Sequence, residues 1–483
     1  MPDLDPDEFR RLGHRFVDWV ADQRAGLDAL PVRDDAVPGS VRGRFDREAA
    51  DEPRPLDALP DLVGDVVSGA DTRWQHPGFH AFFPANASLT SLLGEILSSG
   101  LGAQGMLWST SPACTEVEQA ITDQFARALG LPEAFTHDGG GGGVIQDSAS
   151  SAALVALLAA LHRSNPSWRE TGVTGAERVY VTAETHSSLA KSARVAGLGE
   201  RALRTVGFSP GTRTMDPAAL AAMLDDDVAA GFEPVLVCPT VGTTGTGAVD
   251  PVRAVATAAR PHRAWVHVDA AWAGAAALCH EFRHLTDGVE LADSFCTNAH
   301  KWMLTAFDAS LFWVRDARTL PAALSITPAY LRDASSESGA VVDYRDWQVP
   351  LGRRFRALKL WAVLHGQGLD GLRAHVRGHV RMAADLAARV TAHPGLELAA
   401  PPSLGLVCLR VTGTGSDGGD DDATRALLET VNASGRALLS HTEVDGRFVI
   451  RVAFGSPGTT DRHVDELWTF LTTPVVITGR ESG

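Results

Sequence analysis

The chain has 483 residues, of which 45% are hydrophobic and 21% are charged, a composition typical of globular proteins with a substantial core. Its formal net charge of −16 disfavours nucleic-acid binding, because proteins bind phosphate backbones mainly through Lys and Arg. The length suits a large α/β unit with appended lobes, and small-molecule chemistry is the favoured class of function.

The five cysteines are scattered and form no C-x-x-C pair, so we expect reduced thiols and neither a disulfide framework nor a metal site. The first residues are acidic and lead into an amphipathic segment, unlike the basic flank and apolar run of a secretory signal. No stretch reaches the roughly 18 uninterrupted apolar residues that a membrane span requires. We therefore expect a soluble, cytoplasmic protein that binds neither membranes nor nucleic acid.

The N-terminal segment is predicted to be helical, because residues 7–25 place large apolar side chains at helical spacing, namely Phe9, Leu12, Phe16, Trp19 and Val20. The charged, proline-rich stretch 31–60 cannot continue that helix. A helix followed by an extended arm suits packing on a partner subunit, with packing on its own domain as the alternative. We assign residues 1–85 to an N-terminal helical arm for dimer packing.

Residues 86–370 are predicted to form a large α/β domain. Up to about residue 320, β-rich runs alternate with helical ones, and the β-rich runs lie at 179–181, 235–237, 265–268, 294–296 and 311–314. This alternation favours a mostly parallel central sheet, in which ligands bind beyond the carboxyl ends of the strands. Residues 371–483 follow as a smaller α+β domain, in which the acidic segment 415–422 is expected to be a solvated loop.

Two polar groups near predicted strand ends suggest ligand binding. A glycine run at 139–143 precedes Ser148 and Ser150 at the start of a helical run, where hydroxyls beside free N–H groups can cradle a phosphate. Simple N-capping of the helix is the alternative. Asp269 follows a buried-looking strand, where a carboxylate needs a cationic partner such as a protonated pyridine nitrogen. A helix cap or a structural ion pair is the alternative there.

Two further residues complete a recognisable set. Lys301 follows another strand in an apolar region, where a lysine is paired, used covalently, or extends to solvent. His186 follows the strand at 178–181 and alone would be a polar loop residue. Together, a phosphate cradle, a carboxylate, an imidazole and a lysine are the groups that pyridoxal 5′-phosphate (PLP) requires: the lysine forms a Schiff base, the carboxylate holds the pyridinium proton, and the imidazole stacks on the ring.

From about residue 7 to about residue 470, the sequence resembles the group II PLP-dependent decarboxylases, which include the aromatic-L-amino-acid, histidine, tyrosine and tryptophan decarboxylases. The matching stretches are 76–84, 111–116, 141–146, 267–271, 292–295 and 350–356. The resemblance implies fold type I, the aspartate-aminotransferase-like architecture. It also implies a homodimer with the active site at the subunit interface, which agrees with the predicted N-terminal arm.

The resemblance also implies roles for individual residues. Lys301 corresponds to the Schiff-base lysine, Asp269 to the pyridinium partner and His186 to the imidazole on the ring. The residues expected around the phosphate are Ser148, Ala149, Ser150, Asn298 and His300, and those expected to line the cofactor are Thr244 and Ala271.

The type of reaction depends on two positions. The family's mobile catalytic loop corresponds to about residues 327–339, and its proton-donating tyrosine matches Tyr330. Relatives that make aldehydes oxidatively usually have Phe there, or Asn at the imidazole position, whereas this chain has Tyr330 and His186. Simple decarboxylation is favoured, because without a positioned acid the carbanion survives long enough to meet oxygen.

The sequence departs from the family pattern in two places. Asp147 stands where a glycine is common beside the phosphate cradle, and we expect its side chain to point away. The expected substrate pocket consists of Trp74, Phe82, Phe83, Pro84, Gln104, Met106, Leu107, Phe307, Leu351 and Gly352. In it, Gln104, Met106 and Leu107 stand where animal aromatic decarboxylases have Ile, Phe and Ser. Gly352 favours an indolic, tryptophan-like substrate, because plant relatives with glycine there take indolic substrates. A flexible Met-lined pocket also suits aliphatic methionine, leucine or valine.

Overall fold

The computed structural model describes residues 3–45, 49, 51–67, 69–326 and 341–472. The chain divides into two compact units. The smaller unit comprises residues 1–84, 390–397 and 409–483, and the larger unit comprises residues 85–389 and 398–408. The predicted division into an arm, a large domain and a small domain stays a prediction.

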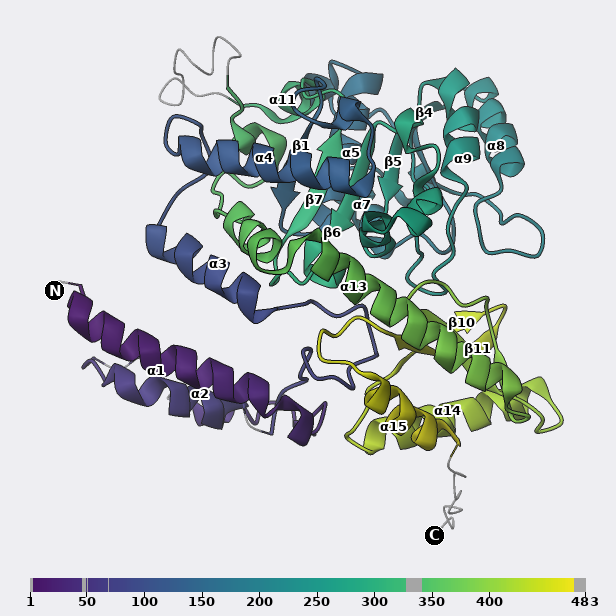
Figure 1. The fold of residues 1–483 in the computed structure, drawn as a ribbon. Helices are drawn as coiled ribbons and strands as arrows, with labels where there is room; N and C mark the ends of the chain where they lie inside the picture. Colours follow the sequence, from purple (N-terminus) through teal and green to yellow (C-terminus); the bar gives the residue numbers. More distant parts are fainter. Residues whose placement is uncertain (1–2, 46–48, 50, 68, 327–340, 473–483) are drawn as a thin grey trace. The chain divides into compact units, whose positions relative to one another are not determined.

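The larger unit contains a seven-stranded sheet (Figure 1). Its strands are β1 (Gly142–Gln146), β2 (Glu177–Val181), β3 (Leu203–Thr205), β4 (Glu233–Val237), β5 (Trp265–Asp269), β6 (Ser294–Asn298) and β7 (Ser310–Val314). They are ordered β1-β7-β6-β5-β4-β2-β3, and β7 runs antiparallel to both of its neighbours while the other pairs are parallel. The predicted mostly parallel sheet is confirmed. Because β1 therefore runs in the same direction as β6, the carboxyl ends of β1, β2, β4, β5 and β6 meet at one edge.

Helices bury most of this sheet. Every residue of β1, β5, β6 and β7 is buried, as expected for strands covered on both faces. The helices of the larger unit are α3 (Leu89–Leu101), α4 (Pro112–Leu129), α5 (Ala149–Ser164), α6 (Trp168–Thr171), α7 (Ser187–Val195), α8 (Pro217–Ala229), α9 (Val252–Ala259), α10 (Ala299–Trp302) and α11 (Thr319–Leu324). Helix α13 (Ala357–Ala392) runs from residues of the larger unit into residues of the smaller one and is interrupted at Gly368, whose φ is 62°. Helix α5 crosses β1, β4, β5, β6 and β7, and its many alanines allow close packing on the strands.

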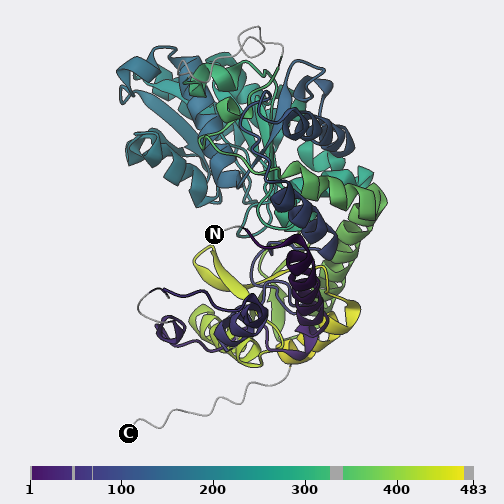
Figure 2. The same ribbon diagram turned by 90° about the vertical axis from the view of Figure 1, so that its left-hand side faces the viewer.

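The smaller unit combines both ends of the chain. The predicted N-terminal helix is confirmed as α1 (Pro6–Ala25), capped by Asp5, and it lies beside α2 (Leu59–Val67) (Figure 1). Ion pairs join α1 to α2 and to the turn before it, with Arg15 3.0 Å from Asp61 and Arg11 2.7 Å from Asp57. The C-terminal elements are α14 (Asp417–Ala433), α15 (Asp461–Thr472) and a sheet ordered β10 (Ser440–Val444), β11 (Arg447–Ala453), β9 (Leu406–Val411) and β8 (Leu396–Leu398). Figure 2 shows the yellow-green hairpin of β10 and β11. Its turn is an Asp-Gly pair, Asp445 and Gly446, with φ of 52° and 75°, a turn that favours hairpins.

The expected acidic loop at 415–422 is wrong from residue 417 onward, because α14 begins there. Ser416 caps the helix by accepting a hydrogen bond from the N–H of Gly419 at 3.1 Å. Carboxylates are stabilised in a first helical turn by the helix dipole. Asp417 and Asp420 lie in that turn. The following residue, Asp421, accepts a hydrogen bond at 3.1 Å from Arg410, whose side chain is fully buried. The acidic residues therefore belong to a folded helix start and neutralise a buried cation.

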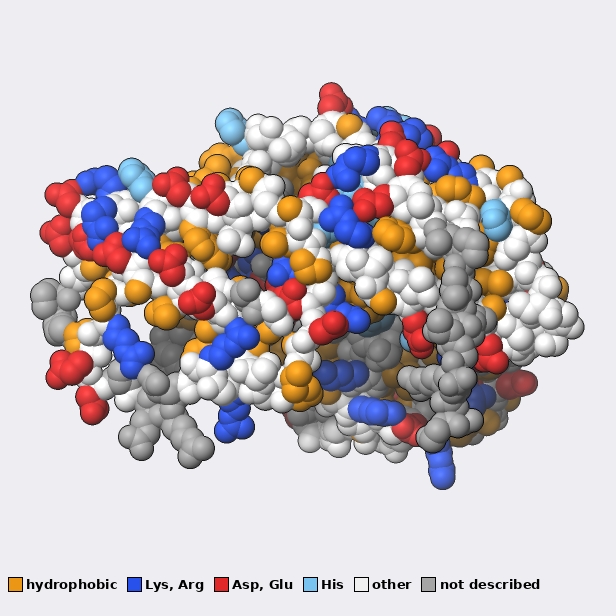
Figure 3. Space-filling view, turned by 90° about the horizontal axis from the view of Figure 1, so that it is seen from below, with side chains coloured by type: hydrophobic (Ala, Val, Ile, Leu, Met, Phe, Trp, Pro, Cys, Tyr) orange, Lys and Arg blue, Asp and Glu red, His pale blue; other side chains and the backbone are white. Residues whose placement is uncertain are grey.

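Among the described residues, no helix is long and apolar enough to cross a lipid bilayer. Figure 3 shows one face of the molecule, on which acidic and basic side chains are interspersed with exposed hydrophobic ones.

Candidate active site

The predicted cofactor residues meet at the carboxyl edge of the large sheet. Ser148 follows β1, His186 follows β2, Asp269 ends β5, and Asn298 ends β6 three residues before Lys301. The strand ends in the sequence predict this placement, and the sheet topology provides it. The charges of Asp269 and Lys301 both act on the imidazole of His186, so these three side chains are close enough to influence one another.

Asp269 presents a buried carboxylate, with 8% of the residue exposed. Its Oδ1 accepts a hydrogen bond from the backbone N–H of Ala271 at 3.0 Å. Its carbonyl accepts another from the N–H of Val241 at 2.8 Å, and Ala270 donates to Cys296 at 3.1 Å. Strand β5 is therefore fixed on both sides where it ends, and the carboxylate has a defined orientation at the edge.

Lys301 lies on the short helix α10 and is half-buried. Asn86 holds this segment, because its side-chain amide donates to the carbonyl of Lys301 and its backbone N–H donates to the carbonyl of His300 at 2.6 Å. The neighbouring Trp302 is fully buried and stacks on Trp272 with ring centroids 5.3 Å apart. The indole N–H of Trp302 donates to His379 at 2.9 Å. The backbone that carries the lysine is thus anchored on both sides.

His186 stands at the start of α7, and its Nδ1 accepts hydrogen bonds from the Ser188 hydroxyl at 2.8 Å and the Ser188 backbone N–H at 3.2 Å. Burial among protein atoms lowers the pKa of the imidazole, Asp269 raises it, and Lys301 lowers it, with a net downward shift. Because Nδ1 accepts, the neutral ring carries its hydrogen on Nε2. A neutral ring suits stacking on a cationic heterocycle better than an imidazolium does.

Ser148 is the N-cap of α5, because its hydroxyl accepts a hydrogen bond from the N–H of Ser151 at 3.3 Å. The capping alternative is therefore correct, and it is compatible with anion binding. The N–H groups of Ala149 and Ser150 belong to the first turn of a helix, where backbone donors have no partner within the helix. Asp147 contacts the Ser148 hydroxyl at 3.4 Å, and its charge acts on Arg356.

Asn298 and His300 are both 4% exposed. Burial is the main cause that lowers the pKa of His300 to about 3, so its ring is neutral, and its Nδ1 accepts the N–H of Ala309 at 3.0 Å. Oδ1 of Asn298 is buried, and no hydrogen-bond partner for it is found in the described part of the chain. A buried acceptor without a partner is costly, and a bound ligand with a donor group would satisfy it. Of the two predicted lining residues, Thr244 is exposed and Ala271 is half-buried.

The predicted substrate-pocket residues belong to both units, and each group is described separately. In the smaller unit, Trp74 stacks on Phe82 at 5.8 Å, and the residues there are Trp74, Phe82, Phe83 and Pro84. In the larger unit, Gln104 and Gly352 line a common cavity of about 400 Å³. There Oε1 of Gln104 accepts the N–H of Arg353 at 2.6 Å. The other predicted pocket residues of the larger unit are Met106, Leu107, Phe307 and Leu351. Of these, Phe307 is 65% exposed and Leu351 is 52% exposed.

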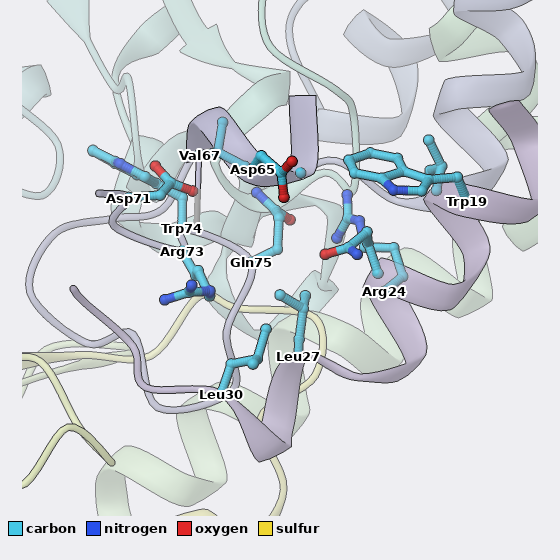
Figure 4. Close-up of a pocket in the computed structure, with 13 residues that line it drawn as sticks. Trp19, Arg24, Leu27, Leu30, Asp65, Val67, Asp71, Arg73, Trp74 and Gln75 are labelled. Atoms are coloured by element: carbon cyan, nitrogen blue, oxygen red, sulfur yellow. The ribbon is translucent and has the colours of Figure 1, made fainter. Parts of the chain in front are cut away.

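A separate cavity of about 590 Å³ lies in the smaller unit, between α1, α2 and residues 71–75 (Figure 4). Trp19, Arg24, Arg73 and Trp74 are among the side chains that line it. The predicted cofactor residues belong to the larger unit and do not line this cavity. Tyr330 and the predicted catalytic loop at 327–339 lie outside the described residues.

Comparison with known proteins agrees with this geometry. Residues 38–412 match the family described as "Pyridoxal-dependent decarboxylase conserved domain". The chain belongs to this family. Its relatives include phenylacetaldehyde synthase of Arabidopsis thaliana, 41% identical over 97% of this chain and 96% of that protein. Tryptophan decarboxylase 2 of Oryza sativa is 40% identical over 97% of this chain and 94% of that protein. A crystal structure of Oryza sativa TDC with PLP and tryptamine superposes with a TM-score of 0.94, at 37% identity over 98% of each chain.

This pyridoxal-dependent decarboxylase is therefore a PLP-dependent carboxy-lyase of fold type I, as the sequence predicts. Its own residues fit the cofactor. The edge offers an amine on Lys301, a buried carboxylate on Asp269, free N–H groups at the start of α5 and an unsatisfied acceptor on Asn298. The first three match an aldehyde, a pyridine nitrogen and a phosphate, and Oδ1 of Asn298 would accept a hydrogen bond from a donor group of the ligand.

Sequence reasoning missed the residues that hold the site from behind. Asn86 fixes the lysine segment from 215 residues away in the chain, and no local pattern marks it. His267 and Cys296 lie beside Asp269, with Cys296 Sγ at 3.8 Å from both His267 Nε2 and Asp269 Oδ1. A signal for this pair did exist, because both occupy the same strand face as the residues that end β5 and β6.

Proposed function

We propose that this protein converts an apolar, aromatic, tryptophan-like L-amino acid to the corresponding amine and carbon dioxide. The observation that carries the proposal is the convergence of Lys301, Asp269 and His186 at one sheet edge in a chain of the decarboxylase family. Relatives named as tryptophan and tyrosine decarboxylases support an aromatic substrate. Gly352 favours the indolic members, because a Cβ there would approach Nε2 of Gln104 to 3.3 Å and narrow the cavity.

When bound, PLP supplies an electron sink for the pair left on the substrate Cα as carbon dioxide departs. In the proposed scheme, Lys301 anchors the cofactor, Asp269 holds a proton at the pyridine nitrogen, and His186 lies against the ring. The N–H groups of Ala149 and Ser150, the Ser148 hydroxyl, Asn298 and His300 surround the phosphate, while Thr244 and Ala271 line the ring. Tyr330 returns a proton to Cα. Proton return closes the cycle as a simple decarboxylation, because a protonated Cα no longer reacts with oxygen.

An oxygen-dependent aldehyde synthase is the second candidate, because relatives of the chain include phenylacetaldehyde synthase of Arabidopsis thaliana. The presence of both Tyr330 and His186 favours the amine-forming reaction. A decarboxylase of methionine, leucine or valine is a third candidate, consistent with Met106 among the predicted pocket residues.

The test of reaction and substrate is a panel of the L-amino acids offered to the holoenzyme, with carbon dioxide, amine, peroxide and ammonia measured together. We expect amine in equal amount to carbon dioxide, and the highest kcat/KM for tryptophan. Peroxide and ammonia in equal amounts to carbon dioxide would establish the aldehyde synthase instead. Preferred turnover of methionine, leucine or valine would overturn the aromatic assignment.

The anchoring lysine can be identified directly, because the chain contains only three lysines: Lys191, Lys301 and Lys359. Lys191 is exposed on α7, and Lys359 is buried and lies 3.0 Å from Glu95. Borohydride reduction of the holoenzyme followed by peptide mass analysis is expected to place the cofactor on Lys301. Lys301→Ala is expected to abolish the visible absorption of the bound cofactor, with Lys191→Ala as the matched control. Cofactor on another lysine, or unchanged absorption in Lys301→Ala, would refute the assignment.

We further propose that the protein is a homodimer with shared active sites. Helix α3 supports this, because its exposed apolar side chains recur at helical spacing along one face, and they are Leu89, Leu93, Ile96, Leu97 and Leu101. A solvated apolar stripe of this kind is unfavourable for a monomer. Sedimentation of the holoenzyme is expected to give twice the chain mass, and Leu93→Asp is expected to weaken the dimer. A monomeric holoenzyme would contradict the proposal.

A further inference from the structure

Two neighbouring strands carry a row of polar side chains that leads from the interior of the sheet to the cofactor edge. Alternate residues of a strand face the same side, so Trp265, His267 and Asp269 share one face of β5. Ser294 and Cys296 lie on the matching face of β6, where Ser294 pairs in register with His267 and Cys296 with Asp269. All five side chains lie in the core, where none is more than 8% exposed.

The contacts along this row are hydrogen bonds between successive members. The indole N–H of Trp265 donates to Oγ of Ser294 at 2.8 Å, and Oγ of Ser294 lies 2.9 Å from Nδ1 of His267. Sγ of Cys296 lies 3.8 Å from Nε2 of His267 and 3.8 Å from Oδ1 of Asp269. The sulfur contacts are longer than those between nitrogen and oxygen, as sulfur's larger radius requires.

The direction of donation follows from the chemistry of the two ends. An indole N–H can only donate, and a carboxylate only accepts. Burial raises the pKa of the Cys296 thiol well above 9.0, so it keeps its hydrogen and donates to Asp269. Its sulfur lone pair then faces Nε2 of His267, which must carry the hydrogen. Burial also lowers the pKa of His267 to about 4, so the ring has a single hydrogen and Nδ1 accepts from the hydroxyl of Ser294.

We propose that His267 and Cys296 are positioning residues, which hold Oδ1 of Asp269 through a chain of hydrogen bonds so that Oδ2 faces the pyridine nitrogen of PLP. Both hydrogen bonds that the structure shows to this carboxylate, from Cys296 and from the Ala271 backbone, end on Oδ1. Neutral donors can orient the carboxylate without competing with a pyridinium for its negative charge. A buried Lys or Arg in their place would compete for that charge. The inference rests on the proposed role of Asp269.

The test compares variants of Cys296 and His267 as holoenzymes reconstituted with PLP that carries ¹⁵N in its ring. The measured quantities are the ring ¹⁵N shift and the affinity for PLP. We expect Cys296→Ala and His267→Phe to move the ring ¹⁵N shift toward the unprotonated value and to weaken PLP binding by about fivefold to tenfold. His267→Gln, which keeps an N–H donor toward Cys296, should restore most of both properties. Should His267→Phe fail to fold, Cys296→Ala and Ser294→Ala carry the test.

Cys238 provides the matched control, because its thiol is equally buried and contacts the backbone of Asp269 instead of the carboxylate. Cys238→Ala should leave the ¹⁵N shift unchanged. The proposal is overturned if Cys296→Ala folds with an unchanged ¹⁵N shift, or if Cys238→Ala moves it equally. Asp269→Asn separates the two levels of inference. If Asp269→Asn leaves the ring ¹⁵N shift at its wild-type value, the role of Asp269 itself is refuted. If Asp269→Asn moves the ¹⁵N shift to the unprotonated value but Cys296→Ala and His267→Phe do not, only the hydrogen-bond chain is refuted.

Discussion

Acid should destabilise this protein in part through a histidine that is buried in its neutral form. Burial lowers the pKa of His267 from its ordinary 6.5 to about 4. Below its ordinary pKa the unfolded chain binds a proton on this imidazole, while the folded chain does not until the pH approaches about 4. The contribution of His267 to the free energy of unfolding is therefore complete above its ordinary pKa and is lost as the pH falls through this window. Between about pH 7 and about pH 5 the loss amounts to about 2 kcal/mol, at roughly 1.4 kcal/mol for each pH unit of the window crossed.

The perturbation is His267→Gln, which removes the titrating group and keeps a donor. Wild type and variant are unfolded in urea as holoenzymes at about pH 7, 6 and 5, with protein and PLP concentrations held constant because ligand binding adds to apparent stability. The variant is less stable at neutral pH, but its free energy of unfolding should fall by about 2 kcal/mol less than that of wild type on going to about pH 5.

Two comparisons isolate the effect. Burial raises the pKa of Asp250 to about 6, which has the opposite sign and makes the folded state relatively more stable as pH falls. Asp250 is present in both proteins, so its contribution cancels in the difference. His365→Gln, which replaces an exposed histidine on α13, is the control for the substitution itself. Parallel pH profiles for wild type and His267→Gln, within about 0.5 kcal/mol, would refute the reasoning.

Three further predictions concern the supports of the site. Asn86→Ala removes the donor to the Lys301 carbonyl and should weaken PLP binding by about tenfold in equilibrium dialysis. An unchanged affinity would show that the backbone around Lys301 keeps its position without Asn86. Trp302→Phe removes the 2.9 Å donor to Nδ1 of His379 and should lower the free energy of unfolding by about 1–3 kcal/mol in urea, a loss that Trp361→Phe at an exposed position of α13 would not reproduce. Ser148→Ala removes a helix cap and should lower the free energy of unfolding by about 1 kcal/mol. It should also weaken the binding of inorganic phosphate to the apoenzyme, and an unchanged phosphate affinity would show that Ser148 caps the helix without binding the anion.

The positions of Asp269, Lys301 and His186 could be predicted because each follows a β-rich, apolar run of the sequence. Parallel strands place their carboxyl ends at one edge, so a polar residue after each run predicts a shared site without any knowledge of contacts. The antiparallel strand β7 does not disturb this, because it lies between β6 and β1 and restores the direction of β1. The prediction of a shared site therefore depends on the direction of the strands more than on where each strand begins and ends.

The residues that sequence reasoning missed are defined by contacts between distant segments. Asn86 acquires its role only when residues 215 positions apart meet, and composition or spacing gives no signal for that. The prediction for the acidic segment 415–422 is wrong for a related reason, because its charges by themselves favour contact with solvent. The buried cation that makes a helix start favourable there belongs to Arg410, on strand β9. Charge patterns alone cannot distinguish a solvated loop from a helix start that neutralises a buried cation.

The row from Trp265 to Asp269 differs from Asn86 and from the acidic segment, because the sequence itself shows it. Every second residue of this strand is Trp, His or Asp. A strand buried on both faces normally shows no alternation of apolar and polar residues. Strand β5 alternates Trp, His and Asp with two valines although all its residues are buried, and β6 places Ser and Cys opposite. Polar side chains on one face of a fully buried strand must satisfy one another, since water does not reach them. An alternating polar row that ends on a candidate catalytic carboxylate therefore predicts a hydrogen-bonded support for that carboxylate, and the ¹⁵N shift of the bound cofactor is the measurement that decides whether this row provides it.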